Sequence, residues 1–302
     1  MRRFWNWLLW GLGILLFGGL VAYAARPAPP PEAEAGPPRG MFEWTDEAVY
    51  NIDEALALCQ ALEINRWYQE FAQPIDYEAV AAFVEALGAK GVRVYALVPG
   101  KDEGFEADAA SLIALLAPIA RYNAIVDAPY RLAGVMADVE PYIRPRWKED
   151  PAAGAALYQA CMESLYAWAQ EQGLPLIACL PRHYDDQGLG GMLEAVIAHA
   201  CDEAAIMNYG CGSEVEAIAT EAALAAQYGK PLHCILEFQE VGKHGLVEEE
   251  TYNNKGVAAA QAAWAQVDAA YPALSIVWDY HYAKPLQEML ARDAAAQAAP
   301  GE

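Results

Sequence analysis

The chain has 302 residues, of which 56% are hydrophobic, and this is enough apolar material for one large core or two small ones. Its 41 acidic residues against 19 lysines and arginines give a net charge of -22, which argues against nucleic-acid binding, because contacts to phosphate need a basic surface. The same charge disfavours polyanionic substrates and leaves neutral or cationic polymers open.

The N-terminus has the pattern of a targeting segment. Two arginines at positions 2–3 precede residues 4–25, an apolar run in which an asparagine is the one strongly polar residue. A run of about 20 residues suffices to cross a bilayer, and the basic pair should stay in the cytoplasm. Residues 22–24 also resemble a cleavage site. We therefore expect residues 1–25 to be a signal anchor, with a cleaved signal peptide as the alternative, and the rest of the chain to be extracytoplasmic, either membrane-anchored or secreted.

Six cysteines are present, and none forms a C-x-x-C pair, so a structural zinc site is not expected and no cofactor is predicted. Export permits disulfides. Four of the cysteines fall inside predicted strands or helices, where cysteine is more often a buried thiol. Cys201 and Cys211 flank a predicted strand and are the favoured pair for a disulfide.

From about residue 40, short apolar runs of strand length alternate with Ala- and Leu-rich stretches of helix length. The predicted strands are Gly40–Trp44, Ile64–Glu70, Val92–Pro99, Leu132–Glu140, Pro175–Leu180, Ala204–Tyr209, Leu232–Phe238 and Ser275–Tyr280. The predicted helices span roughly 47–61, 77–89, 106–121, 152–172, 190–200, 214–228, 252–270 and 284–292. Gly91, Gly173 and Gly229 fall between a helix and the next strand, as helix C-terminal caps do.

Eight strand–helix units over about 250 residues match a (β/α)8 barrel, the TIM-barrel fold, in number and length. The alternative is an open doubly wound sheet, but no G-x-G-x-x-G follows the first strand. We therefore predict an α/β protein in which the N-terminal transmembrane or signal segment is followed by a proline-rich linker over residues 26–39. The barrel domain should span residues 40–292, and an Ala-rich flexible tail should span residues 293–302.

Acidic and aromatic residues gather at the carboxyl ends of the predicted strands, which meet at one mouth in a parallel barrel. They are Asp138 and Glu140 on the fourth strand, Met207 and Tyr209 on the sixth, Glu237 on the seventh and Trp278 on the eighth. This assortment suits sugars, because aromatic rings stack on the apolar faces of pyranoses and carboxylates serve as proton donors and nucleophiles.

The fourth strand resembles a known signature. Glycoside hydrolase family 18, the chitinase family, carries D-x-x-D-x-D-x-E on this strand, and the four motif positions here are Ala133, Met136, Asp138 and Glu140. The run Met207-Asn208-Tyr209-Gly210 resembles that family's sixth-strand M-x-Y-D, with Gly210 in place of the acid. Trp278 matches the eighth-strand tryptophan that floors the family's sugar site.

The resemblance implies hydrolysis of an extracytoplasmic glycan that contains N-acetylhexosamine. Glu140 would protonate the glycosidic oxygen. Asp138 would orient the acetamido group of the substrate, whose carbonyl oxygen attacks the anomeric carbon in place of an enzyme nucleophile, and Tyr209 would hold that group through its hydroxyl. Glu140 would need a raised pKa to carry a proton near neutrality, and both the charge of Asp138 and desolvation by aromatic walls would act in that direction.

Three motif positions, Ala133, Met136 and Gly210, have lost their polar groups, which is consistent with an altered substrate, weak activity or none. Two alternatives therefore stay open. Val139-Glu140-Pro141 resembles the N-E-P of a large clan of retaining glycosidases, in which Glu237 would be the nucleophile and the two carboxyls would lie about 5–5.5 Å apart. A non-catalytic carbohydrate-binding barrel is the second alternative.

Further substrate-binding candidates lie near strand ends: Tyr142, Trp67, Asn208 and Tyr280, besides Met207 and Trp278. The nine tryptophans and 17 tyrosines outnumber the seven phenylalanines, and such amphipathic aromatics suit wet sugar clefts. His183, His233 and His281 follow no metal-binding spacing, and we interpret them as structural or supporting residues.

Overall fold

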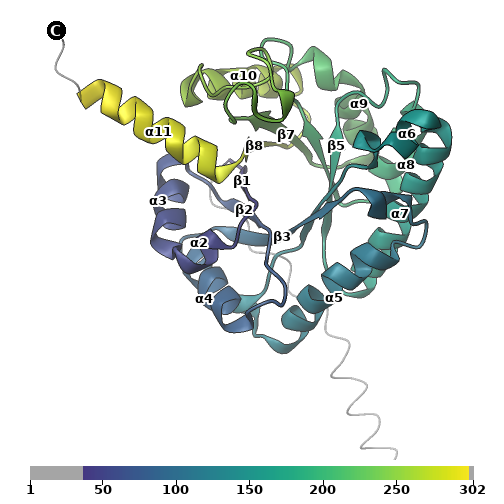
Figure 1. Ribbon diagram of the computed structural model, residues 1–302, viewed down its shortest axis with the longest axis horizontal. Coiled ribbons are helices and arrows are strands. Elements are labelled where there is room, and N and C mark those ends of the chain that lie inside the picture. Colours follow the sequence, from purple (N-terminus) through teal and green to yellow (C-terminus); the bar gives the residue numbers. More distant parts are fainter. Residues whose placement is uncertain (1–36, 299–302) are drawn as a thin grey trace, which may run out of the picture. The chain divides into compact units, whose positions relative to one another are not determined.

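The computed structural model describes residues 37–298, so the predicted signal segment and most of the linker lie outside the described residues. Eight parallel strands close into a barrel in the order β1 to β8, with the helices on the outside (Figure 1). The predicted (β/α)8 barrel is thus confirmed. The strands are β1 (Arg39–Glu43), β2 (Arg66–Gln69), β3 (Arg93–Gly100), β4 (Val135–Val139), β5 (Leu176–Pro181), β6 (Glu203–Met207), β7 (Leu232–Glu237) and β8 (Ile276–His281). Residue 39, predicted as the end of the linker, begins the first strand.

Each predicted helix is present with shifted ends, and α6 has no counterpart in the prediction. The helices are α2 (Glu47–Tyr50), α3 (Ile52–Leu62), α4 (Tyr77–Gly88), α5 (Ala110–Ile125), α6 (Pro145–Glu149), α7 (Pro151–Glu171), α8 (Gly190–His199), α9 (Ala219–Tyr228), α10 (Val257–Ala270) and α11 (Ala283–Ala298). Gly229 ends α9 in the left-handed conformation, with φ of 64°, as a C-terminal cap should. The tail predicted to be flexible from residue 293 is helical as far as residue 298, because alanine is the strongest helix former.

Side chains alternate across each strand, so one set packs against the helices and the other fills the barrel. The outward set joins the apolar faces of the helices in a large core. The inward set forms a smaller cluster, which includes Phe42, Tyr68, Tyr95, Met136, Ile177 and Met207. The barrel is therefore filled with side chains, as expected for eight strands.

All six cysteines are free thiols, so the predicted Cys201–Cys211 disulfide is wrong. The two cysteines flank β6, and a strand rises about 3.3 Å per residue, which carries them well past the ~7 Å limit between the Cα atoms of a disulfide. The Cys201 thiol donates instead to the Val196 carbonyl at 3.6 Å. The Cys211 thiol donates to the Thr251 carbonyl at 3.4 Å.

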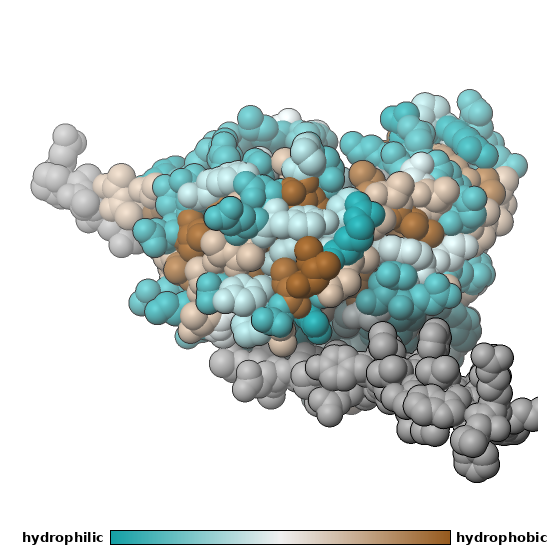
Figure 2. Space-filling model, turned by 90° about the horizontal axis from the view of Figure 1, so that it is seen from below, coloured by the Kyte–Doolittle hydropathy of each residue, from teal (hydrophilic) through white to brown (hydrophobic). Residues whose placement is uncertain are grey.

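The surface seen in Figure 2 is a mosaic of hydrophilic residues and small, separate hydrophobic groups. Within residues 37–298, the large apolar side chains that are exposed come from α2, α5 and loops: Tyr50, Leu115, Ile125, Ile143, Val241 and Val247. No helix in this range combines the length and apolar character that a bilayer crossing requires.

Candidate active site

The carboxyl end of β4 brings two carboxylates to the mouth of the barrel. Asp138 and Glu140 are two residues apart, so alternation puts them on one face, above the fully buried Met136. The backbone N–H of Glu140 still donates to the Gly100 carbonyl of β3 at 2.7 Å. Pro141 then begins a 3₁₀ turn and ends the strand. Both acids therefore lie at the tip of a rigid strand.

Asp138 is poorly supplied with hydrogen-bond partners. Its Oδ1 atom is buried and has none, while the Cys179 thiol of β5 hydrogen-bonds to the carboxyl group. Burial raises the pKa of Asp138 to about 7, and the charge of Glu140 acts in the same direction. A carboxyl group with this pKa is partly protonated at neutral pH, so it can hold or share a proton.

Tyr142 lies beside the acid pair, on the turn after β4. Its hydroxyl donates to Glu140 Oε1 at 2.5 Å. Burial raises the pKa of Tyr142 and the charge of Glu140 raises it further, so the phenol stays a neutral donor. The rings of His183 and Tyr184 pack edge-on against it, with centroids 5.2 and 5.9 Å away. This aromatic wall holds the donor and the acid in place.

Glu237 ends β7, is 2% exposed, and has all of its acceptor sites occupied. Its Oε1 accepts the backbone N–H groups of Phe238 and Gln239, both at 2.8 Å. Its Oε2 accepts from the Gln239 side chain at 3.0 Å and lies 2.9 Å from Nδ1 of His281. Burial alone would raise the pKa of Glu237, but the charge and hydrogen bond of His281 hold it below its usual value. Since a carboxylate has about four lone-pair sites, none is left for a substrate.

Trp44 follows β1 and is a mouth residue that the sequence prediction missed. Its indole Nε1 donates to Nε2 of His281 at 3.0 Å. An indole only donates, so the proton of neutral His281 sits on Nδ1 and is donated to Glu237. Burial lowers the pKa of His281, the charge of Glu237 raises it above its usual value, and the indole N–H opposes protonation. Alternation from the inward-facing Phe42 identifies Trp44 as inward-facing too.

Tyr209 and Met207 approach the mouth from β6. Met207 belongs to the inward cluster, and Tyr209 packs against that cluster with its ring 5.8 Å from His281. Burial raises the pKa of Tyr209, and the charge of Glu237 adds to this. The phenol is therefore a neutral hydroxyl donor near the acids, which suits the binding of a substrate carbonyl.

The aromatic residues of β8 lie on the opposite face from the one predicted. Trp278 stacks on Trp264 of α10, with centroids 5.5 Å apart and planes 11° apart, and Tyr280 packs against the same ring at 4.7 Å. The prediction that Trp278 and Tyr280 line a sugar site is therefore wrong. The inward positions of β8 belong to the polar residues Asp279 and His281, which have hydrogen-bond partners inside the barrel.

Two further substrate candidates also lie away from the mouth. Trp67 packs outward against Phe83 of α4, with centroids 6.2 Å apart. Asn208 is fully buried, and its side-chain amide donates to the Glu214 carbonyl at 2.9 Å. Both residues fix packing or a loop, so the prediction that they contact substrate is wrong.

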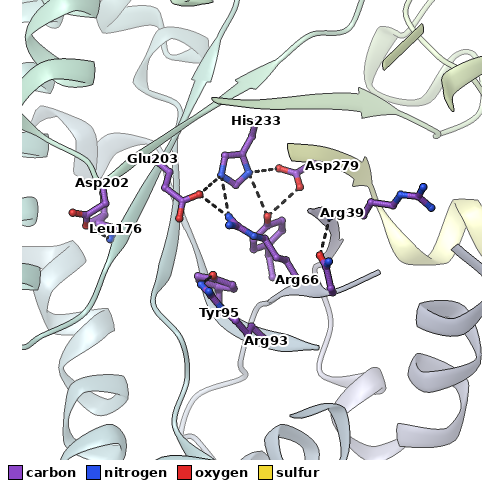
Figure 3. Close-up of polar contacts among 11 residues, drawn as sticks. Arg39, Arg66, Arg93, Tyr95, Leu176, Asp202, Glu203, His233 and Asp279 are labelled. Atoms are coloured by element: carbon purple, nitrogen blue, oxygen red, sulfur yellow. Dashed lines mark hydrogen bonds and ion pairs between the residues drawn. The ribbon is translucent and has the colours of Figure 1, made fainter. Parts of the chain in front are cut away.

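A second polar group fills the barrel toward the amino ends of the strands (Figure 3). His233 of β7 contacts Asp279 through Nδ1 at 2.7 Å and Glu203 through Nε2 at 2.9 Å. Arg66 also contacts Glu203, at 2.6 Å, and the Tyr68 hydroxyl donates to Asp279 at 3.0 Å. We call these five residues the floor network. The sequence predicts His233 as structural but does not reveal its partners, because they come from three other strands, β2, β6 and β8.

The floor network keeps its charges by pairing them. Burial alone would lower the pKa of His233, but the charges and hydrogen bonds of Asp279 and Glu203 raise it. Burial would likewise raise the pKa of Glu203, yet the hydrogen bond and charge of His233, with those of Arg66, bring it down to about 2. Within residues 37–298, the floor network included, no group of three or more His, Cys, Asp or Glu residues is arranged to hold a metal ion.

No protein-family model matches this chain, and no curated protein matches it. Among solved structures, the chain is similar to a chitinase from Bacteroides thetaiotaomicron, with a TM-score of 0.53 and 11% identity over 84% of this chain and 94% of that one. A family GH18 chitinase variant from Cycas revoluta, in complex with (GlcNAc)4, has a TM-score of 0.52 and 11% identity over 87% of this chain and 100% of that one. A GH113 beta-1,4-mannanase has a TM-score of 0.52 and 8% identity over 81% of this chain and 87% of that one.

These likenesses bear out the resemblance to chitinase-type barrels at the level of the fold. At such low identities they carry no residue roles. One barrel architecture hosts many chemistries, so the residues at the mouth of the barrel, and not the fold, determine the function.

Proposed function

We propose that this protein is a glycoside hydrolase that cleaves glycans containing N-acetylhexosamine, with Glu140 as the general acid and base. One observation carries the proposal. Asp138 and Glu140 stand side by side at the mouth, whereas both oxygens of Glu237 are consumed by hydrogen bonds. The site thus has a proton donor pair but no free carboxylate nucleophile, and an acetamido group on the substrate supplies the missing nucleophile.

The reaction then runs in two steps. The acetamido carbonyl oxygen attacks the anomeric carbon while Glu140 gives its proton to the departing glycosidic oxygen, and a cyclic oxazolinium ion forms. Glu140 next takes a proton from water, which attacks the same carbon and restores the acetamido group with retention of configuration. Asp138 is partly protonated near pH 7, and in its ionised form it accepts from the acetamido N–H and stabilises the positive charge of the intermediate.

The two-carboxylate mechanism is less well supported. A nucleophilic carboxylate needs an exposed lone pair directed at the sugar. Glu237 is buried, its four acceptor sites are filled by two backbone amides, Gln239 and His281, and its charge is held in place by them. These contacts suit a residue that positions His281 and Trp44 at the mouth.

The test compares the full chain with Glu140→Gln on paired aryl glycosides, one set with a 2-acetamido group and one with a 2-hydroxyl group. We expect turnover of the acetamido set alone, reduced roughly 10²–10⁴-fold in the variant. Glu149→Gln, which changes an exposed acid at the end of α6, is the matched control and should keep full activity. Activity on the 2-hydroxyl set would instead identify an enzyme nucleophile, and glycan retention without any product would identify a binding protein.

We also propose that the barrel works outside the cytoplasm, tethered to the membrane by residues 1–25. The motivation is the apolar run after the arginine pair and the proline-rich stretch of residues 26–36 that follows it. Protease added to intact cells should digest the barrel if the proposal holds. Full protection, with digestion only after lysis, would overturn it.

A further inference from the structure

An arginine occupies the space beside the glycine that replaces an acid in the sixth-strand motif. Arg182 follows β5, and Gly210 follows Tyr209 after β6. A Cβ atom built on Gly210 would lie 2.1 Å from Nη1 of Arg182 and 2.8 Å from Cζ. The backbone of Gly210 does not have a positive φ, so its conformation does not require glycine. The glycine leaves room for the guanidinium group, which a side chain at this position would displace.

The location of Arg182 ties it to the proposed site. It lies between Pro181, the last residue of β5, and His183, whose ring packs 5.2 Å from that of Tyr142. Tyr142 in turn donates to the catalytic candidate Glu140. On the other side, the guanidinium touches the residue that directly follows Tyr209. Arg182 is therefore at the rim of the mouth, flanked by two segments that carry site residues.

The guanidinium group is partly exposed, and no hydrogen bond or ion pair joins it to another side chain within residues 37–298. The two acids in its own loop form no ion pair with it: Asp185 accepts from Thr220 Oγ1 at 2.5 Å, and Asp186 is exposed. In a protein with a net charge of -22, a cation held at the mouth without an acidic partner is a feature that needs a ligand to explain it.

We propose that Arg182 binds a carboxylate carried by the glycan, so the substrate is an N-acetylhexosamine polymer with acidic substituents. This inference rests on the glycoside hydrolase proposed above and names its substrate class. Guanidinium groups bind carboxylates through two parallel N–H donors, and such charge-assisted bonds are about twice as strong as neutral ones. In the family that this chain resembles, the motif position carries an acid. Here the position is Gly210, and the cationic guanidinium of Arg182 lies against it.

A substrate with spaced carboxylates is compatible with the acidic surface. The overall negative charge repels a dense polyanion. A single carboxylate at the rim, however, contacts one cation directly. This local attraction outweighs the repulsion from acidic residues that lie beyond a Debye length of about 8 Å, because salt screens them. The acids at the mouth also favour one defined pose, because a carboxylate placed next to Glu140 or Asp138 would be repelled.

The test uses the full chain carrying Glu140→Gln, in which turnover is slow enough for binding to be measured, and two tetrasaccharides of identical shape. Both contain N-acetylglucosamine with a 3-O-lactyl group on alternate sugars, one with the lactyl carboxylate free and one with it converted to the amide. Calorimetry should give about tenfold or greater preference for the carboxylate form. Adding Arg182→Gln should bring the ratio of the two affinities to within about twofold, whereas adding Arg121→Gln, an exposed arginine on α5, should leave the ratio unchanged.

A second variant moves the charge without removing it. In Gly210→Ala, the new methyl group displaces the guanidinium, so the preference for the carboxylate form should also fall. Equal affinity for the two forms while Arg182 is present, or a preference that persists in Arg182→Gln, overturns the inference. Turnover of unsubstituted N-acetylglucosamine tetrasaccharide by the unmodified chain is measured in parallel. If the chain turns over this substrate but shows no preference for the carboxylate form, the hydrolase proposal holds and the Arg182 proposal is overturned. If it shows neither binding nor turnover, both proposals are overturned.

Discussion

The barrel interior has two polar layers, one toward the amino ends of the strands and one at their carboxyl ends. In the floor network, two cations, Arg66 and His233, meet two carboxylates, Glu203 and Asp279, and each charged group is within 3 Å of an opposite one. At the mouth, Asp138 has a buried oxygen without any partner and an acidic neighbour in Glu140.

The difference separates structure from chemistry. Pairing lowers the pKa of Glu203 to about 2 and fixes its charge at all ordinary pH values, so the floor cannot exchange protons with a substrate. Burial, helped by the charge of Glu140, raises the pKa of Asp138 to about 7, which makes proton exchange possible near neutrality. The lowered pKa of Glu203 thus marks the end of the barrel that serves stability, and the raised pKa of Asp138 marks the end that serves reactivity.

The largest expected effect is on stability, from Glu203→Gln. Arg66 and His233 both lose a carboxylate partner inside the barrel, so the free energy of unfolding should fall by about 3–5 kcal/mol. Urea unfolding of the variant measures this. Glu163→Gln, an exposed acid on α7, is the matched control and should change stability by less than about 0.5 kcal/mol. A loss below about 1 kcal/mol would mean that the floor network does not stabilise the barrel.

The second prediction is that Asp138→Asn lowers turnover but raises stability. Turnover should fall by roughly 100-fold, because the variant cannot ionise to stabilise the developing charge. The pKa of Asp138 rises from its usual 3.8 to about 7 in the folded chain, so the folded state holds the extra proton between these values. Stability therefore falls as pH rises through that window, and the asparagine should remove the fall.

Unfolding curves of both proteins at several pH values between about 4 and 8 measure this difference. The free energy of unfolding of the variant should increase relative to that of the parent chain as pH rises, and the difference should be largest above about pH 7. Parallel stability profiles would show that Asp138 is not strained by its surroundings.

The parts of the fold that depend on local patterns could be predicted from the sequence. Strand and helix periodicity, with glycine caps such as Gly229, gave all eight strands and the barrel. Asp138, Glu140 and Tyr142 come together because they lie within five residues of one another at one strand end. Alternation alone relates their directions, so no long-range information was needed.

The facing of β8 could not be predicted in this way. Alternation divides a strand into two faces but does not say which face is inward, and apolar residues were expected inside. On β8 the inward positions are polar, so Asp279 and His281 point inward and Trp278 packs on α10. Contacts between distant segments, such as Arg182 against Gly210, likewise have no local signature.

The third prediction sharpens the contrast between inward and outward tryptophans. Trp44→Ala removes the half-buried indole at the mouth and should weaken glycan binding by about 3–10-fold, the range of an aromatic contact. Trp278→Ala removes a ring stacked on Trp264, so it should lower the unfolding temperature and leave glycan affinity unchanged. Affinity measurements with chitin oligosaccharides distinguish the two, and weaker binding in Trp278→Ala alone would reverse the assignment of the faces.

The smallest expected effect comes from Tyr142→Phe, which removes one hydrogen bond from Glu140. Turnover should fall by about 2–10-fold, because a hydrogen bond of this kind contributes about 0.5–1.5 kcal/mol. Tyr166→Phe is the matched control, because Tyr166 donates to Asp202 at 2.9 Å, away from the mouth. Equal turnover in Tyr142→Phe and the parent chain would mean that the hydrogen bond from Tyr142 to Glu140 does not support the reaction.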